Sequence, residues 1–143
     1  MHSLRSICLL LSTAFQLSHV LALNPGPDFV RLDKDDAMVI VADLQEGLYQ
    51  VVRDYDTAVF RNNMIAHAGI AKLFNLPIVL TTSAETGPNG PLPKEISTMY
   101  PDAPLIRRNG EVDAWDNPDF RAAVLAQNKS QVILAGITTD VCK

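Results

Sequence analysis

The sequence predicts an α/β domain with a parallel β-sheet. Short, nearly continuous apolar runs rich in β-branched residues alternate along the chain with segments in which apolar residues recur at helical spacing. Such alternation is typical of parallel sheets whose strands are connected by helices. The chain has 143 residues, of which 48% are hydrophobic and 20% are charged, so it is long enough for one globular domain with a core.

Four segments are predicted to be strands, because each is a short apolar run bounded by turn residues. They are AMVIVADL at 37–44, LPIVLTTS with its strand at about 77–82, APLIRR at 103–108 and SQVILAG with its strand at 131–136. The first is almost wholly apolar, as strands covered on both faces tend to be.

The segments between these strands carry helix signals. A helix can start around Asp56 and Thr57, because apolar residues from Phe60 onward recur near helical spacing. Asn117 and Pro118 form a strong helix start, with Asn as the N-cap and Pro at the first helical position. KEISTMY is predicted to be a short helix. ETGPNGP is predicted to be a loop, since two prolines and two glycines in seven residues disfavour regular structure.

The first 22 residues have the layout of a secretory signal peptide. Arg5 precedes an apolar run, and Val20 and Ala22 are small residues at the −3 and −1 positions of a cleavage site. Polar residues interrupt the run, which falls short of the roughly 20 residues of a membrane anchor. We predict that 1–22 is a signal peptide, that 23–143 is the mature domain, and that the protein is secreted. With a non-functional leader it would be cytoplasmic.

The mature chain is acidic and contains a single cysteine. No basic patch is present to neutralise phosphates, so nucleic acid is not expected to be a partner. Cleavage after Ala22 would also leave nothing to hold the chain at a membrane. Cys142 would then be either reactive or paired with another chain, as lone thiols in exported proteins are. Asn128 begins a glycosylation sequon that is usable only on export.

Polar residues follow the end of each predicted strand. Asp43 ends the first, residues 82–85 follow the second, Arg107 and Arg108 end the third, and Cys142 follows the fourth. Binding sites in parallel sheets gather outside the carboxyl ends of the strands. We therefore predict a site at this edge of the sheet.

The types of these residues indicate nucleophilic chemistry. A helix N-terminus at Cys142 would favour its thiolate, and free backbone N–H groups there could hold an oxyanion. Asp43 could accept the thiol proton. Each residue also has a plainer interpretation, as a buried apolar cysteine at a strand–helix junction and as an aspartate that caps the next turn.

Three other candidates are weaker. The two arginines could clamp a carboxylate substrate or stabilise an Asp–Cys pair, or they could form a solvated dipeptide. Trp115 could wall a small apolar pocket or belong to the core. His67 lies mid-helix between apolar positions, so neither a Cys–His dyad nor a metal site is predicted.

Four stretches, VADLQEGL, LTTSAETGPNGPL, RNGEVDAWDNPDF and ILAGITTDVC, resemble the isochorismatase-like cysteine hydrolases, most closely their YcaC-type branch. The match runs in register over about 29–142, and the TTSxETGPNGP stretch is highly specific for that branch. The resemblance implies a three-layer α/β fold with a parallel sheet.

The resemblance also implies roles for single residues. Asp43 would be the base and Cys142 the nucleophile. Arg108 stands where the wider family has lysine, and because arginine stays charged it would act electrostatically rather than relay a proton. A cis peptide is expected at Ile137–Thr138, where it would aim a backbone N–H at the oxyanion.

Less directly, Gln45, Glu85 and Trp115 would line the substrate site. The implied reaction is hydrolysis of a small amide or a related C–N or C–O bond through a covalent acyl-enzyme. The resemblance implies a small-molecule substrate and assembly into homo-oligomers. It implies no cofactor, and the histidines with which some family members bind zinc are absent from this sequence.

The family pattern continues past the cysteine, whereas this sequence stops at Lys143. We therefore expect a truncated record of a secreted cysteine hydrolase. The alternative is a short, catalytically inactive product that acts as a binding or decoy subunit. A third interpretation is a redox-sensing or intermolecularly paired thiol.

Overall fold

The computed structural model describes residues 29–138. The predicted signal peptide and Cys142 lie outside the described residues. Residues 32–138 belong to one compact unit. In the preceding unit, the Arg31 guanidinium lies 5.5 Å from the centroid of the Phe29 ring.

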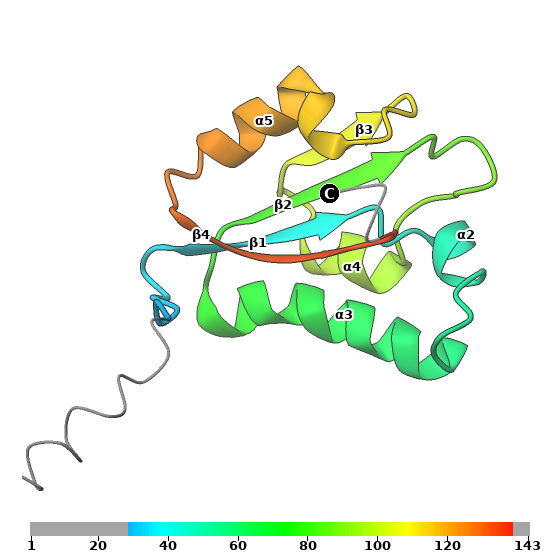
Figure 1. The fold of residues 1–143 in the computed structure, drawn as a ribbon, viewed down its shortest axis with the longest axis horizontal. Helices are drawn as coiled ribbons and strands as arrows, with labels where there is room; N and C mark the ends of the chain where they lie inside the picture. The colour runs from blue at the N-terminus through cyan, green and yellow to red at the C-terminus, as the bar shows by residue number, and fades with distance from the viewer. Residues whose placement is uncertain (1–28, 139–143) are drawn as a thin grey trace, which may run out of the picture. The chain divides into compact units, whose positions relative to one another are not determined.

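The described residues form a four-stranded parallel sheet in the order β3-β2-β1-β4 (Figure 1). The strands are β1 (Ala37–Ala42), β2 (Ile78–Ser83), β3 (Leu105–Arg108) and β4 (Gln131–Gly136). Val41 pairs with Leu80 of β2 on one side and with Ala135 of β4 on the other. All four predicted strands are confirmed, and β1 lies between β2 and β4.

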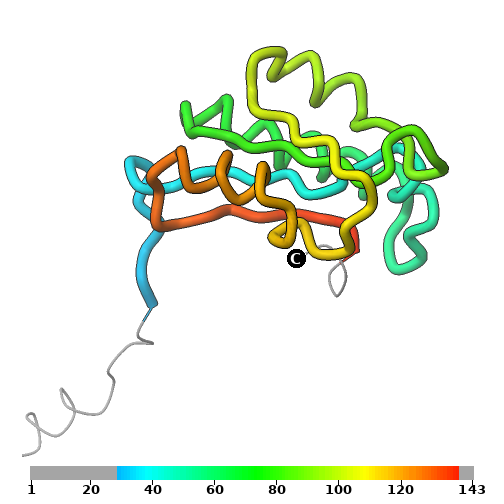
Figure 2. The backbone as a smooth tube through the Cα atoms, turned by 90° about the horizontal axis from the view of Figure 1, so that it is seen from above, coloured from blue at the N-terminus to red at the C-terminus, as the bar shows by residue number. Residues whose placement is uncertain are grey.

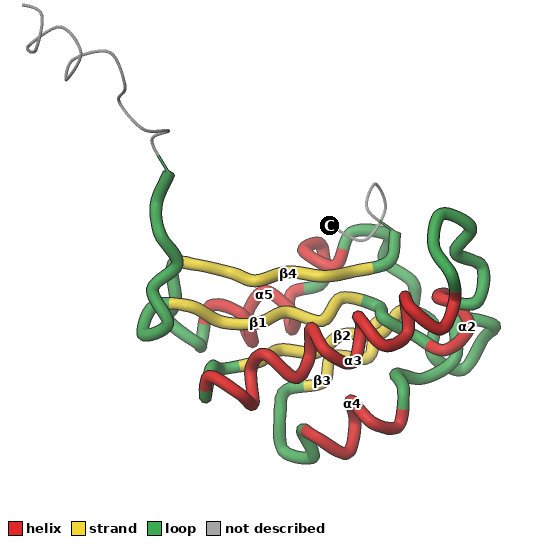
Figure 3. Tube along the Cα trace, turned by 90° about the horizontal axis from the view of Figure 1, so that it is seen from below, coloured by secondary structure: helices red, strands yellow, loops and turns green. Residues whose placement is uncertain are grey.

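Helices cover both faces of this sheet, which gives the predicted three-layer α/β fold. Helices α3 (Thr57–Phe74) and α4 (Lys94–Met99) lie on one face, and α5 (Pro118–Leu125) lies on the other (Figures 1 and 3). Seen from above, α5 runs alongside the strands (Figure 2). None of the helices in 29–138 is both long and apolar enough to cross a bilayer.

Both predicted helix starts are confirmed, and at each of them a side chain caps the helix. Asp56 is the N-cap of α3, and its carboxylate accepts hydrogen bonds of 3.0 Å from the Ala58 and Val59 amides. Asn117 is the N-cap of α5 and accepts from two amides of the first turn, with Pro118 at the first helical position. These side chains satisfy backbone N–H groups that have no partner within the helix.

The core lies on both sides of β1. Its side chains alternate between a larger cluster under α3 and α4 and a smaller cluster under α5, as the two-residue period of a strand requires. Val39, Val41 and Leu80 belong to the first cluster with Met64 of α3, and Phe120 of α5 belongs to the second. All six residues of β1 are buried. The apolar run is therefore covered on both faces, as predicted.

The first strand ends earlier than predicted, at Ala42 rather than at Leu44. Asp43 has a φ of 56°, in the left-handed region, which ends the extended conformation. A four-residue helix, α2 (Glu46–Tyr49), follows the turn. The sequence patterns did not predict α2 or the short 3-10 helix η1 (Ala114–Asp116).

Candidate active site

Asp43 lies at the carboxyl end of β1, in the turn that ends the strand. Its backbone N–H donates to the Thr81 carbonyl of β2 at 3.0 Å, and its φ is positive. Aspartate tolerates this conformation better than most residues, because its short polar side chain can bond locally. The side chain is fully buried.

Arg108 reaches Asp43 from the end of β3, two strands away. Its side chain is fully buried and forms an ion pair between Nη2 and the Asp43 Oδ2. Nε donates to Thr81 Oγ1 at 2.9 Å, and Nη1 donates to the Glu111 carbonyl. All three nitrogens of the guanidinium therefore have partners, which a buried charge requires. The structure brings together Asp43 and Arg108, as the sequence predicts.

The second oxygen of the Asp43 carboxylate has no such partner. Among the described residues, Oδ1 is buried and accepts no hydrogen bond. Buried polar atoms in proteins are nearly always hydrogen-bonded, so an unpartnered one calls for an explanation. Oδ1 can therefore accept a proton or a hydrogen bond from a group outside residues 29–138, such as a substrate or another part of the chain.

The end of β4 brings Ile137 and Thr138 to the same edge. Ile137 is buried, and its N–H donates to the Ala42 carbonyl at 3.2 Å. The peptide bond between Ile137 and Thr138 is cis, as the family resemblance predicts. At Gly136 an added Cβ would lie 3.0 Å from both the Cβ and the carbonyl oxygen of Ala42, so a larger residue would have to displace the end of β1 slightly. Cys142 lies outside the described residues.

A cavity of about 170 Å³ opens beside these two residues. Its walls come from the turn after β2, the segment after β3, α2 and the end of β4, and its lining residues are Leu48, Ser83, Asn89, Gly110, Glu111, Val112, Ile137 and Thr138. The Glu111 carboxylate accepts from Asn117 Nδ2 at 2.9 Å, and this hydrogen bond lowers the Glu111 pKa. The Glu111 side chain is therefore an anion at neutral pH.

Gln45 is fully buried next to this cavity but is not among its lining residues. Its Nε2 donates to the Ser83 carbonyl at 3.0 Å and to the Gly90 carbonyl, and its Oε1 accepts from the Ser83 amide at 2.8 Å. Both amide hydrogens are used within the protein. The Gln45 amide therefore has no free N–H to donate to a substrate, contrary to its predicted contact with one.

Neither Glu85 nor Trp115 lines the cavity of about 170 Å³, although Glu85 and Arg108 line a second cavity together. Glu85 accepts from Thr82 Oγ1 at 3.0 Å and pairs with Arg107 Nε at 2.9 Å, beside a larger open cavity. Trp115 is 45% exposed and packs edge-on against Phe120, with ring centroids 6.3 Å apart. The tryptophan thus belongs neither to the core nor to the cavity of about 170 Å³.

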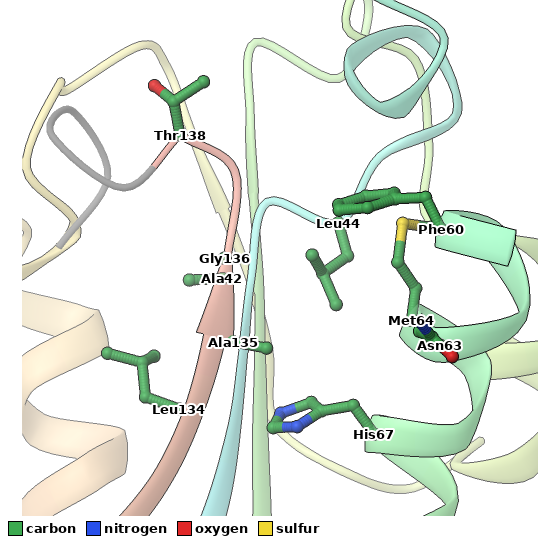
Figure 4. Close-up of a pocket in the computed structure, with 10 residues that line it drawn as sticks. All are labelled: Ala42, Leu44, Phe60, Asn63, Met64, His67, Leu134, Ala135, Gly136 and Thr138. Carbon is green, nitrogen blue, oxygen red and sulfur yellow. The ribbon is translucent and has the colours of Figure 1, made fainter. Parts of the chain in front are cut away.

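His67 lies away from the strand ends, as its mid-helix position predicts. Its Nε2 is 3.0 Å from the Ile40 carbonyl, and the ring faces a mainly apolar cavity of about 340 Å³ between α3 and β4 (Figure 4). Within 29–138, no group of three or more His, Cys, Asp or Glu side chains is arranged to hold a metal ion.

Sequence reasoning missed two parts of this site. The hydroxyl of Thr81 and the carbonyl of Glu111 both fix the Arg108 guanidinium. Thr81 follows the buried Leu80 in the predicted second strand. Successive residues of a strand point to opposite faces, so the sequence could have indicated that the Thr81 hydroxyl lies on the other face of the sheet. A backbone carbonyl such as that of Glu111 leaves no signal in a sequence.

No protein-family model matches the chain. The chain is 54% identical over 114 residues to the probable hydrolase YcaC of Escherichia coli strain K12, a match covering 80% of this chain and 55% of that protein. The solved structure of the E. coli YcaC gene product, an octameric hydrolase of unknown specificity, is similar at a TM-score of 0.78 and 54% identity, over 82% of this chain and 57% of that one.

YcaC from Pseudomonas aeruginosa, solved with hexane-2,5-diol and covalent acrylamide, is similar at a TM-score of 0.78 and 53% identity, over 82% of this chain and 58% of that one. An isochorismatase family protein has a TM-score of 0.61 at 16% identity, over 77% and 69% of the two chains, which shows the fold alone. The chain is thus homologous to the YcaC hydrolases over this span and has the isochorismatase-like fold. It spans a little over half the length of these YcaC relatives.

Proposed function

We propose that this chain is a cysteine hydrolase of the isochorismatase-like family, with Cys142 as nucleophile, Asp43 as general base and Arg108 as their electrostatic support. The observation that carries the proposal is the buried Oδ1 of Asp43, which accepts no hydrogen bond from any described residue. A thiol delivered from the segment after Thr138 would satisfy it.

The reaction proceeds in two balanced stages. The Cys142 thiol gives its proton to Asp43 Oδ1 while sulfur forms a bond to the substrate carbonyl carbon. The carbon–nitrogen bond then breaks, the amine leaves with the proton held by Asp43, and a thioester remains. Water then attacks the thioester carbon and gives a proton to Asp43. The carbon–sulfur bond breaks, the carboxylic acid leaves, and Asp43 returns the proton to the sulfur, which restores the thiol.

Arg108 contributes by fixing the carboxylate that moves the proton. Its Nη2 holds Oδ2 of Asp43, so Oδ1 alone is left to face the thiol. Thr81 and the Glu111 carbonyl hold the guanidinium in turn, and such pre-arranged charge needs no reorganisation during reaction. Backbone N–H groups after the cis peptide would receive the oxyanion.

The proposed substrate is a small, neutral amide. The cavity of about 170 Å³ accommodates a few heavy atoms, and Glu111, an anion at neutral pH, is one of its lining residues, which favours a neutral ligand over an anionic one. The P. aeruginosa YcaC structure holds covalent acrylamide, which reacts with thiols at its C=C bond, so this adduct supports a reactive thiol and leaves the substrate to be inferred from the cavity. We further propose a homo-oligomer, because E. coli YcaC is octameric.

Acrylamide and a panel of small primary amides test this proposal on the full chain. We expect acrylamide to modify Cys142, located by peptide mapping, and Cys142→Ala to lower amide hydrolysis on the order of 10³-fold or more. Cys8→Ala is the matched control, since the chain has two cysteines, and it should keep full activity. Hydrolysis that survives Cys142→Ala would remove the nucleophile from the proposal.

A further inference from the structure

The loop after β2 is bonded directly to the turn that follows Asp43. The amide of Glu46 donates to the Pro91 carbonyl at 2.9 Å, and the amide of Gly47 donates to the Asn89 carbonyl at 2.8 Å. Both amides lie in the first turn of α2, where a helix has no carbonyls of its own to offer them. Loop carbonyls some forty residues further along the chain supply the missing acceptors.

Gly47 allows the two segments to touch. An added Cβ at Gly47 would clash with the Pro88 carbonyl oxygen and come within 3.0 Å of the Asn89 backbone. The loop backbone therefore lies directly against α2, at a distance that only glycine permits. The absence of a side chain at Gly47 thus permits the two hydrogen bonds between α2 and the loop.

Gln45 completes this contact with its side chain. Its amide bonds to both backbone groups of Ser83, at the end of β2, and to the carbonyl of Gly90 in the loop. Asn89 adds a further hydrogen bond, from Nδ2 to the Ser83 carbonyl at 2.9 Å. One buried side chain thus joins three segments: the turn after β1, the end of β2 and the loop. We call this set of hydrogen bonds the Gln45 clamp.

The Gln45 clamp borders the proposed active site on two sides. Ser83 and Asn89 are both lining residues of the cavity of about 170 Å³. On the other side, the Gln45 amide donates to the Asp43 carbonyl at 2.7 Å, across the turn that carries the catalytic carboxylate. A displacement of Gln45 would therefore reach the cavity wall and the Asp43 turn together.

Asp43 has supports outside the clamp, whereas the loop part of the cavity wall is bonded to the domain through it. The Asp43 amide is bonded to Thr81, and its carboxylate is bonded to Arg108. Ser83 is also held within the sheet, where it pairs with Arg108 of β3. The loop residues Asn89 and Gly90, in contrast, are bonded to Ser83, to Gln45 and to the Gly47 amide. Loss of the Gln45 side chain should loosen the wall more than the carboxylate.

We propose that Gln45 is a positioning residue that sets the substrate-binding wall of this site, rather than a residue that contacts substrate. Its effect on catalysis rests on the proposed function, whereas its effect on the wall does not. Removing it weakens binding of a small amide while leaving the chemical step at the thiol nearly intact. A residue with only a general stabilising role would not separate these two quantities.

Hydrogen exchange of single backbone amides tests the wall independently of activity. In Gln45→Leu we expect the Ser83, Glu46 and Gly47 amides to exchange at least about tenfold faster. The Ser83 amide loses its acceptor, and the Glu46 and Gly47 amides donate to loop carbonyls that Gln45 helps to hold in place. Amides of β4 should keep their rates. Gln127→Leu is the matched control, since Gln127 also bonds a backbone carbonyl, on α5, and it should leave all these amides unchanged.

Acrylamide modification of Cys142 then tests the catalytic consequence. In Gln45→Leu we expect the half-saturating acrylamide concentration to rise about tenfold and the maximal rate to change less than about threefold. Unchanged exchange at the Ser83 amide, or a fall in the maximal rate alone, would overturn the role of Gln45. Should wild-type Cys142 fail to react, the proposed function falls, and the exchange rates still decide the clamp.

A second variant covers the case in which Gln45→Leu does not fold. Asn89→Ala removes one hydrogen bond of the same clamp from a partly exposed position. Faster exchange at the Ser83 amide, by a smaller factor than in Gln45→Leu, would support the clamp. Exchange equal to that of the wild type would reject it.

Discussion

Strands β1 and β4 pair with each other over six residues, yet their surroundings differ. Every residue of β1 is buried, whereas Val132 and Leu134 of β4 are 43% and 50% exposed. Both strands are apolar runs that the sequence patterns predict as strands. This difference shows that an apolar run indicates a strand, while the elements packed on the strand determine how far it is buried.

The proposed active site combines these two environments. Asp43 and Arg108 come from the ends of β1 and β3, and each is held by hydrogen bonds within the well-covered part of the sheet. Ile137 and Thr138 come from the end of β4. The core therefore positions Asp43 and Arg108, whereas the proposed nucleophile Cys142 follows β4, the strand with exposed side chains.

The largest loss of stability is expected from breaking the buried ion pair between Arg108 and Asp43. Arg108→Met should lower the free energy of unfolding by about 3–5 kcal/mol, because it leaves the Asp43 carboxylate buried without its partner. Urea denaturation measures this change. Arg107→Met is the control, because the neighbouring Arg107 side chain is 63% exposed. This change should lower the free energy of unfolding by less than about 1 kcal/mol. Equal losses in the two variants would contradict the importance of the buried pair.

An intermediate effect is expected from one substitution made on both strands. Val39→Ala on β1 should cost about 2–3 kcal/mol of unfolding free energy, because it removes two methyl groups from a fully buried position and leaves a cavity. Val132→Ala on β4 should cost about 1 kcal/mol or less, since its side chain is 43% exposed.

The pair is measured by the same urea titration, with Val132→Ala serving as the control for Val39→Ala. A loss at Val132 as large as that at Val39 would mean that a further element covers β4 in solution. The comparison between the two strands would then hold only for the described residues.

Local patterns explain which parts of the fold could be predicted. Asp56 and Asn117 cap helices through amides two or three residues away, so their role is visible in the sequence. The four strands are likewise short apolar runs. Helix α2 could not be predicted, because the carbonyls that complete its first turn come from residues 89–91, far along the chain.

The same distinction explains the candidate site. Asp43 and Arg108 were predicted to act together from their places at strand ends and from the family resemblance, and they are in contact. The environment of Gln45 depends on a segment some forty residues away, and the exposure of Trp115 depends on where α5 packs. Neither can be read from residues adjacent in sequence.

The smallest effect is expected at the rim of the covered face, where α3 meets α4. Arg61 Nη2 lies 2.8 Å from both carboxylate oxygens of Glu95, and this hydrogen bond is the main cause that lowers the Glu95 pKa. A carboxyl whose pKa is lower in the folded state stabilises the fold above its ordinary pKa, and this stabilisation is lost as the pH falls through the folded value. Melting temperatures of the wild type and Glu95→Gln should therefore differ at neutral pH and converge in acid. Arg61→Met should lose at least as much at neutral pH, because it also removes the ion pair with Glu46 at 3.8 Å. The double variant should lose less than the sum of the two single variants, because both changes remove the Arg61–Glu95 pair. A difference that persists at low pH would mean that Glu95 supports this face through packing rather than through its charge.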